Sequence, residues 1–570
     1  MRDVSARRRS NRICRKAGVL ICRYNTSVLV IIAAILLVLF YSPVLSISLH
    51  YSRNYNEGWN AFLALAAQNG GRLYEGTESL FINNYPPLSF FLLGNLGLSL
   101  GDNIYAGRVT SLLSLAFVGV AIYISAQMLR ATKRQAAVGT LFFALLNATF
   151  FREYVAANDP QWLAHAAMMP ALMLLLARPA PTAGSVIIAC ILIAIGLLIK
   201  HSLVALPLAI SIWLFRFHRT KFNLWALTGI ILVILATSAS YFFYGKNIFS
   251  AIFAHVRVFS WSRMAVQAAI VLPFMLPFVG ALKTLMRTRS SDHRDDLILL
   301  FAALAIPLGI IQRAGEGVDY NAHFEAFIAL TIALGAALSR YKPGIYCGKE
   351  QASLFLVVSV FATPILCLPY FIFNAVDEIH SAGKTMRDWS KVIGSVASIS
   401  GPVACDVQAI CYWAGKQREI DFFNYGQRLR AGYGDVALAR ALKDQRYAAI
   451  ILHDEPPIDF QKRVSDPFHD LIYQHYKVKQ HLPAGFVILR PIAENPTFVD
   501  RGITGKVDFL CGPFFPCRFT RLAQQGHQVK GAPRLVLQCE ARRPVEGVVD
   551  APRPARFRIK PEKVVVDQHA

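Results

Sequence analysis

The sequence predicts a polytopic α-helical membrane protein with about eleven transmembrane helices and a small C-terminal extracytoplasmic α/β domain. Of its 570 residues, 55% are hydrophobic and only 16% are charged, and its mean hydropathy is +0.41. Soluble globular proteins usually carry about 25% charged residues. The first long apolar run, residues 27–49, contains no charged residue and is long enough to cross a hydrocarbon core of roughly 30 Å. A cleaved signal peptide is not expected, because this run exceeds the usual apolar core of about 7–15 residues and many runs follow it.

Further apolar runs follow the first one along the chain. They cover residues 106–129, 136–150, 160–176, 185–199, 203–215, 224–244, 265–282, 297–311, 323–338 and 354–373. Lysine and arginine cluster after every second run, as after residues 265–282, where Lys283, Arg287, Arg289 and Arg294 follow. Because cytoplasmic loops are enriched in these residues, the pattern predicts a cytoplasmic N-terminus and an extracytoplasmic C-terminal region.

The formal net charge of +24 does not indicate nucleic-acid binding, because its placement follows the expected membrane topology. Eight basic residues precede the first apolar run: Arg2, Arg7, Arg8, Arg9, Arg12, Arg15, Lys16 and Arg23. Much of the remaining excess lies in short turns between runs and in a basic C-terminal tail. We therefore expect a lipid bilayer, and no nucleic acid, among the partners of this chain.

Composition divides the chain into four predicted parts. These are a basic cytoplasmic N-terminus (residues 1–25), a transmembrane domain (26–373), an extracytoplasmic α/β domain (374–492) and a disordered tail (493–570). In the third part, short strand patterns near residues 402–405, 448–452 and 485–489 alternate with helical patterns near 386–396, 436–442 and 468–476. The tail is rich in Pro, Arg, Gly and Val and has no clear periodicity.

The ten cysteines do not form a metal-binding pattern. Two pairs lie in the region expected outside the cytoplasm, at Cys405/Cys411 and at Cys511/Cys517. Disulfides persist in such compartments, and loops of this size can close. The sequence alone leaves open whether either pair forms.

Polar residues gather in the loops that this topology places outside. Glu57 follows the first apolar run, Asp159 ends the second outer loop, and Lys200 and His201 lie between the fifth and sixth runs. Further polar residues occupy later outer segments: Arg257, Asn321, His323 and Glu325. Each has an ordinary alternative, since Glu57 can be a solvated loop acid, Asp159 can cap a helix and Lys200 can snorkel. The last three can equally form a structural polar cluster.

Together these residues predict a group-transfer site at the outer membrane surface. A carboxylate can accept the proton of an acceptor hydroxyl as that hydroxyl attacks, and we expect Glu57 to stand in water for this role. Cations can bind and stabilise a phosphate leaving group. A donor that approaches from the bilayer would explain why the site is built on membrane helices.

Several short motifs resemble bacterial membrane glycosyltransferases of the GT-C class. More narrowly, the chain resembles family 39-like proteins related to protein O-mannosyltransferases, aminoarabinose transferases and rhizobial galacturonosyltransferases. The matching positions are Asn-Glu-Gly at 56–58, Asn-Tyr-Pro-Pro-Leu at 84–88, Arg108, residues 154–159, Lys200-His201, residues 319–325 and residues 405–416. The order and spacing of these motifs, over roughly residues 28–491, carry the resemblance.

This resemblance implies a polyprenyl-phosphate-linked sugar donor, transfer on the periplasmic side of the bacterial inner membrane, and inversion at the sugar carbon. The acceptor would be a lipid, glycan or protein of the cell envelope. The resemblance makes Glu57 the expected base and Asp159 a second catalytic acid. It assigns substrate binding to Asn56, Tyr85, Arg108, Lys200, His201, Arg257, Asn321, His323 and Glu325.

The chain departs from the family pattern at two positions. Asn56 stands where relatives often have an acid, and Tyr85 stands where they often have a lysine before Pro-Pro. Contact with the phosphate is therefore expected from Lys200 or Arg257. Some relatives bind a divalent metal, but the sequence offers no convincing ligand set, so no cofactor is expected.

Two other classes of protein fit the membrane topology. A transporter or lipid flippase would place charged residues near the bilayer midplane and often contains repeated halves or broken helices. A non-catalytic envelope scaffold would keep the fold without turnover. The gathering of charges at one outer face favours the enzyme.

Overall fold

The computed structural model describes residues 30–76, 79–253, 257–340, 348–432, 436–453 and 468–492. The predicted cytoplasmic N-terminus (1–25), the predicted tail (493–570) and the pair Cys511/Cys517 lie outside these residues. By its contacts the chain divides into one unit over Met1–Pro496 and a second over Thr497–Ala570. All described residues lie in the first unit.

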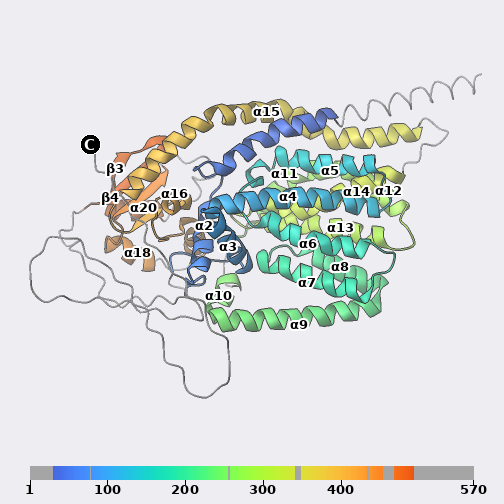
Figure 1. Ribbon diagram of the computed structural model, residues 1–570, viewed down its shortest axis with the longest axis horizontal. Helices are drawn as coiled ribbons and strands as arrows, with labels where there is room; N and C mark the ends of the chain where they lie inside the picture. The colour runs from blue at the N-terminus through green and yellow to red at the C-terminus, as the bar shows by residue number, and fades with distance from the viewer. Residues whose placement is uncertain are drawn as a thin grey trace, which may run out of the picture. The chain divides into compact units, whose positions relative to one another are not determined.

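Most of this unit is helical, as the sequence predicts (Figure 1). The first membrane helix covers Val30–Ser48 and ends in the 3₁₀ turn η1 (Ser46–Ser48). The helices up to residue 253 are α2 (Asn56–Gln68), α3 (Leu88–Leu100), α4 (Asn103–Met128), α5 (Lys133–Ala148), α6 (Gln161–Leu176), α7 (Ala183–Ile199), α8 (Ala205–Phe217), α9 (Arg219–Tyr244) and α10 (Asn247–Phe253). Those that follow are α11 (Trp261–Met275), α12 (Val279–Arg287), α13 (Arg294–Arg313), α14 (Phe324–Arg340) and α15 (Gly348–Ala397).

Within the described residues, seven helices are long and apolar enough to cross a membrane, judged by length and composition. They cover Val30–Ser48, Asn103–Met128, Arg219–Tyr244, Trp261–Arg287, Arg294–Arg313, Tyr320–Arg340 and Leu356–Ala397. Four further apolar helices have 10–17 residues: α3, α6, α7 and α8. The predicted polytopic helical class is confirmed, whereas the predicted count of eleven spans remains a prediction.

The segment between the first membrane helix and α4 is not the open outer loop that the sequence suggested. It contains α2 and α3, each of 13 residues. The helix α3 starts directly after Pro86-Pro87 and is followed by Gly101, which has a φ of 82°. A glycine in this left-handed conformation commonly ends a helix. At about 1.5 Å per residue, a helix of this length is shorter than a bilayer core, so its apolar pattern does not predict a full membrane span.

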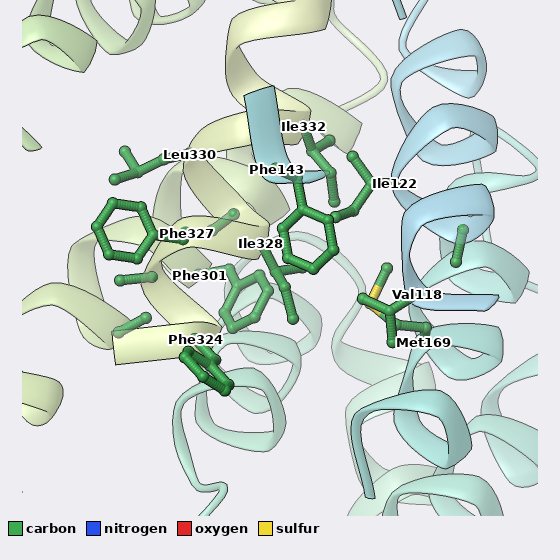
Figure 2. Packing of buried hydrophobic residues seen from close by; sticks show 14 of the residues in the cluster. Val118, Ile122, Phe143, Met169, Phe301, Phe324, Phe327, Ile328, Leu330 and Ile332 are labelled. Carbon is green, nitrogen blue, oxygen red and sulfur yellow. The ribbon is translucent and has the colours of Figure 1, made fainter. Parts of the chain in front are cut away.

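The helix α14 lies at the centre of the hydrophobic core. Its residues from Phe324 to Leu338 are all buried. Figure 2 shows Phe324, Phe327 and Ile328 of α14 near Phe301 of α13 and Phe143 of α5. The approach to α5 depends on glycine, because a Cβ at Gly139 would lie 2.4 Å from the carbonyl oxygen of Thr331.

A four-stranded sheet forms from residues beyond α15, with the strand order β1-β2-β4-β3. The strands are β1 (Val403–Cys405), β2 (Ala449–His453), β3 (Tyr476–His481) and β4 (Phe486–Pro491). The strands β1 and β2 are parallel, with Ala404 opposite Ile450, and the other pairs are antiparallel. The crossover from β1 to β2 contains α16 (Gln408–Trp413), α17 (Phe422–Arg430) and α18 (Val436–Lys443), and α20 (Phe468–His475) precedes β3. These elements occupy the region in which the sequence predicts alternating strands and helices.

The sheet region is joined closely to the helical region. The helix α15 runs without interruption through residue 373 and packs against α16 and the turn η5 (Pro483–Gly485) before β4 (Figure 1). Cys405 at the end of β1 forms a disulfide with Cys411 of α16. The helix α16 in turn packs on α2, where a Cβ at Gly58 would lie 2.0 Å from the backbone nitrogen of Ala409. The helices α2 and α15 therefore share one packed interface with the sheet region.

Candidate active site

Four segments that are far apart in the sequence bring a polar cluster together; one of them contributes Tyr85, which lies three residues before α3. Asn56 is the first residue of α2, Asp159 immediately precedes Pro160 at the start of α6, and Lys200 follows the last residue of α7. All three lie at helix ends, where side chains can reach across the gaps between helices. We call Asn56, Tyr85, Asp159 and Lys200 the central cluster.

The carboxylate of Asp159 is the hub of the central cluster. Its Oδ1 atom accepts hydrogen bonds from Lys200 Nζ at 3.1 Å and from the Gln161 backbone nitrogen at 2.8 Å. Its Oδ2 atom accepts one bond, from Asn56 Nδ2 at 3.2 Å. A carboxylate has about four lone-pair positions, so Oδ2 retains one for a further donor.

The ammonium group of Lys200 is held between Asp159 and Tyr85. Its Nζ atom lies 5.0 Å from the centre of the Tyr85 ring, within the range of a cation–π contact. Burial opposes its positive charge, but the Asp159 carboxylate and the Tyr85 hydroxyl outweigh burial and raise the pKa of Lys200. Lys200 is therefore charged at neutral pH.

Arg257 and His201 lie close enough to this cluster to interact with it electrostatically. Arg257 is half-buried, and its Nη1 atom donates to the carbonyl oxygen of Glu316 at 2.9 Å. Burial lowers the pKa of Arg257, against the opposing effects of Tyr85, Asp421 and Glu316. Within the described residues Arg257 forms no ion pair, so it is available to an anionic ligand. Burial, together with the charges of Lys200 and Arg257, lowers the pKa of His201 to about 4, so His201 is neutral at pH 7.

Glu57 does not stand in water as expected, because its side chain is completely buried. Its Oε1 atom accepts bonds from Arg108 Nε at 2.7 Å and from the Asn158 backbone nitrogen at 3.0 Å. Its Oε2 atom accepts bonds from Arg108 Nη2 and from the Arg53 backbone nitrogen, both at 2.7 Å, and a longer one from the Ser52 hydroxyl at 3.5 Å. These five bonds occupy its lone-pair positions and leave none for an acceptor hydroxyl.

Charge and hydrogen bonding also make Glu57 a weak proton acceptor. Burial alone would raise the pKa of its carboxyl group, but the Arg108 guanidinium and the two backbone amides outweigh burial and lower it. A carboxylate with a lowered pKa has less tendency to take a proton at neutral pH. The geometry therefore gives Glu57 a structural role.

Arg108 is the partner of Glu57, and it is saturated in the same way. Its Nη1 atom donates to the carbonyl oxygens of Ser46 and Leu49, both at 2.7 Å, and Nη2 also donates to the carbonyl of Tyr51. With its two bonds to Glu57, all five guanidinium N–H donors are used. In this structure Arg108 therefore joins the end of the first membrane helix to α2 and leaves no donor for a substrate, unlike the predicted binding role.

Comparison with solved structures finds ArnT from Cupriavidus metallidurans in the apo state. The two chains align with a TM-score of 0.52 at 13% identity, over 81% of this chain and 98% of that chain. The chain has the GT-C fold. The crystal structure of the same ArnT bound to undecaprenyl phosphate aligns with a TM-score of 0.50 at 13% identity, over 82% and 99% of the two chains.

The archaeal oligosaccharyltransferase AglB from Archaeoglobus fulgidus, in complex with an inhibitory peptide and a dolichol-phosphate, has a lower TM-score of 0.48. It is 12% identical over 75% of this chain and 69% of that chain. No protein-family model and no curated protein sequence matches this chain. The GT-C fold therefore rests on the arrangement of the helices rather than on sequence similarity.

The fold places the predicted site residues of the segment 319–325 in different surroundings. Asn321 Nδ2 donates to Gln161 Oε1 at 3.3 Å, and because Gln161 also binds Asp159, Asn321 lies at the border of the central cluster. Glu325 instead accepts bonds from the Leu206 and Ala205 backbone nitrogens, at 2.9 and 3.2 Å. It therefore caps the N-terminus of α8, where the helix dipole favours a negative charge.

His323 lies away from this border. It is completely buried, and a Cβ at Gly309 of α13 would lie 2.6 Å from its Nδ1 atom. The ring therefore packs against the backbone of α13. His323 and Glu325 are packed between membrane helices in this structure. Neither side chain is available to a substrate, in contrast to the predicted binding role.

Sequence reasoning missed residues that support the site in the GT-C fold. Gln161 stands two residues after Asp159, so its position in the first turn of α6 was a usable signal. Asp421 had no such signal, because it reaches the site from the sheet region. It is buried and accepts a bond from the hydroxyl of Tyr55 at 2.6 Å, across a sequence separation of 366 residues. Within the described residues no group of three or more His, Cys, Asp and Glu residues is placed to hold a metal ion.

Proposed function

We propose that this chain is an integral membrane glycosyltransferase that transfers a sugar from a polyprenyl-phosphate donor to a cell-envelope acceptor. The observation that carries this proposal is the buried Asp159 carboxylate, which pairs with Lys200 and keeps one lone-pair position unfilled. Arg257 adds a second cation, which interacts electrostatically with Tyr85 of the same cluster. A base next to cations is the arrangement that hydroxyl attack and phosphate departure require. The GT-C fold adds support, because ArnT was crystallised with undecaprenyl phosphate.

In the proposed reaction Asp159 is the general base. Its Oδ2 atom accepts the proton of the acceptor hydroxyl while the hydroxyl oxygen forms a bond to the anomeric carbon. The bond from that carbon to the phosphate oxygen breaks, and its electron pair stays on the lipid phosphate. Attack from the side opposite the phosphate inverts the anomeric carbon. Asn56 donates to the same Oδ2 atom and so orients the carboxylate.

Lys200 and Arg257 are the proposed ligands of the departing lipid phosphate. Each can donate charge-assisted hydrogen bonds to phosphate oxygens. His201 is neutral at pH 7 and can donate a hydrogen bond without adding charge. Tyr85 replaces the lysine often found in relatives, and its ring holds the Lys200 ammonium group.

Glu57 is proposed as a positioning residue rather than as the base. Its backbone carbonyl oxygen accepts a bond from Asn158 Nδ2 at 2.9 Å, and its carboxylate binds the Asn158 backbone nitrogen. Asn158 directly precedes Asp159. Through these bonds Glu57 and Arg108 fix the distance between Asn56 and Asp159.

The proposed topology keeps the N-terminus in the cytoplasm and the sheet region in the periplasm. The Cys405–Cys411 disulfide supports this placement, because disulfides persist in oxidising compartments such as the bacterial periplasm. The count of eleven spans belongs to the same proposal. Under it, the central cluster faces the periplasmic surface of the bacterial inner membrane.

The decisive measurement is release of polyprenyl phosphate from a panel of lipid-phosphate sugars by purified protein in lipid nanodiscs. We expect Asp159→Asn to lose at least roughly a hundredfold in turnover, the scale of a general base. Glu153→Gln is the matched control, because this exposed acid lies in the same loop. Full activity of Asp159→Asn would refute the assigned base. Absence of turnover in folded wild type, with movement of the lipid across the bilayer, would favour a flippase instead.

A further inference from the structure

A cavity lies between the turn after the first membrane helix and the sheet region. It encloses about 190 Å³. The turn contributes Ser52, Arg53 and Asn54, and the opposite wall includes Trp389, His453 and Phe486. Pockets for drug-sized ligands usually measure about 300–1,000 Å³, so this volume suits one sugar ring rather than a whole glycan.

The wall on the sheet side is aromatic. The Phe486 ring centre lies 5.5 Å from Trp389 and 4.9 Å from His453, with interplanar angles of 82° and 72°. Aromatic rings have negative faces that attract the weakly positive C–H groups of a sugar ring. Such a wall recognises the apolar side of a sugar and leaves its hydroxyls to polar groups.

The shape of this wall is fixed by an uncommon backbone conformation. Ala484, which lines the cavity, has a φ of 56°, and Gly485 follows with a φ of 73°. A Cβ at Gly485 would lie 2.8 Å from His453 Cε1, so the turn lies directly against the His453 ring. A non-glycine residue in this conformation costs about 1–3 kcal/mol and persists only where its surroundings impose it. The packing around Ala484 and Gly485 therefore holds the turn against the His453 ring.

Arg53 gives the cavity its charge. Its guanidinium donates to the carbonyl oxygens of Val155 and Arg152, the latter at 3.0 Å, so three of its five N–H donors remain. In the part of the chain that the structure describes, it forms no ion pair. Burial lowers the pKa of Arg53, and the positive charge of Arg108 lowers it further. The negative charge of Glu57 opposes this but does not outweigh burial. An anion in the cavity would offset the cost of burying this charge.

The environment of Arg53 differs from that of the proposed phosphate ligands. Arg53 interacts electrostatically with Glu57, Arg108, Glu378 and Tyr51. Arg257 interacts instead with Tyr85, Asp421 and Glu316. Arg53 and Arg257 therefore have different charged neighbours, and in the proposed reaction Arg257 already serves the lipid phosphate together with Lys200.

We propose that this cavity binds one anionic sugar unit of the acceptor, with Arg53 pairing its carboxylate or phosphate and the aromatic wall holding its ring. The proposal rests on the proposed function, since it assumes that the chain has a sugar acceptor. The cavity adjoins the central cluster through Asn54. The Oδ1 atom of Asn54 accepts a bond from the Asn56 backbone nitrogen at 3.0 Å. An acceptor held at Asn54 would have its neighbouring hydroxyls near Asn56 and Asp159.

Binding can be measured without turnover, by saturation-transfer NMR on the full-length protein in nanodiscs. The probes are glucuronic acid and glucose 6-phosphate, which separate the carboxylate and phosphate sources, and glucose is the neutral control. We expect one anionic probe to bind wild type and to bind Arg53→Gln at least about tenfold more weakly, the scale of a lost charged hydrogen bond. Arg72→Gln is the matched control, because it removes an exposed guanidinium that does not line the cavity, and it should bind this probe as wild type does. Loss of binding in Arg257→Gln would place the probe at the proposed phosphate ligands instead.

A second variant protects the test against misfolding of Arg53→Gln. Val407 also lines the cavity, and Val407→Phe would fill it without touching the bonds of Arg53. We expect this variant to keep the melting temperature of wild type within a few degrees and to lose the probe. Equal binding of glucose, loss of binding in Arg257→Gln alone, or no binding of either anionic probe to folded wild type would each overturn the proposal.

Failure of this proposal can be distinguished from failure of the proposed function. Release of polyprenyl phosphate with no probe binding would leave the transferase standing and remove the acceptor site. Probe binding at Arg53 without release of polyprenyl phosphate from any donor would retain the sugar site and argue against the transferase.

Discussion

Replacing Glu57 with glutamine removes the negative charge that Arg108 is paired with, while it preserves the size of the side chain. The Arg108 side chain is only 1% exposed and the Glu57 side chain 0%. Breaking a buried ion pair by neutralising one partner usually costs about 3–5 kcal/mol, because the remaining charge is left in a low-dielectric interior. We therefore expect Glu57→Gln to lower the free energy of unfolding by a few kcal/mol.

Because Glu57 acts through position in this proposal, its loss should affect folding more than chemistry. The assay follows the melting temperature of the protein in nanodiscs and, on the folded fraction, release of polyprenyl phosphate. Arg108→Gln is the matched partner variant. The double variant Glu57→Gln/Arg108→Gln should be more stable than the sum of the single effects predicts, since neither charge is then left alone.

The pH dependence of this pair has a defined sign. The pKa of Glu57 is lowered in the folded protein, so its stabilising effect is present above the usual carboxyl pKa of about 4.3 and is lost as pH falls through the folded value. The melting temperature of wild type should therefore fall more steeply below about pH 4 than that of Glu57→Gln. A Glu57→Gln variant that melts like wild type at every pH but loses a hundredfold in turnover would refute our reasoning and restore Glu57 as the base.

Three further predictions concern the interface between α2 and the sheet region. Gly58→Ala should destabilise the protein by about 1–3 kcal/mol, because its Cβ would lie 2.0 Å from the Ala409 backbone nitrogen; Gly184→Ala, where a Cβ meets nothing within 4 Å, should be neutral or stabilising in the same thermal melt. Removing the disulfide with Cys405→Ser/Cys411→Ser should cost about 2 kcal/mol for a loop of this size, measured by melting with and without reductant; equal melting temperatures would contradict this. Tyr55→Phe should cost roughly 1 kcal/mol of stability through its lost bond to Asp421, and the larger loss should appear in turnover, because Tyr55 precedes Asn56; unchanged turnover would exclude the sheet region from positioning the site.

The sequence by itself determined the class of this protein and the positions of most of its helices. A membrane helix can be predicted from its own apolar run, because each of its backbone polar groups must bond within the same helix in a bilayer. Beyond residue 397, local patterns predicted the strands β1, β2 and β4 and the helices α18 and α20, but not α16, α17 or β3. The short helices α2 and α3 were not predicted either, because their 13 residues are too few to resemble a span.

Only the tertiary structure decided how many hydrogen bonds each carboxylate accepts, since both side chains are buried. Glu57 and Asp159 look alike in the sequence, since each is an acid in a predicted outer loop. Glu57 is closed by Arg108, 51 residues away, whereas Asp159 keeps a lone pair between Asn56 and Lys200, at separations of 103 and 41 residues. Hydrogen-bond saturation is a property of these long-range neighbours, so no local pattern could reveal it.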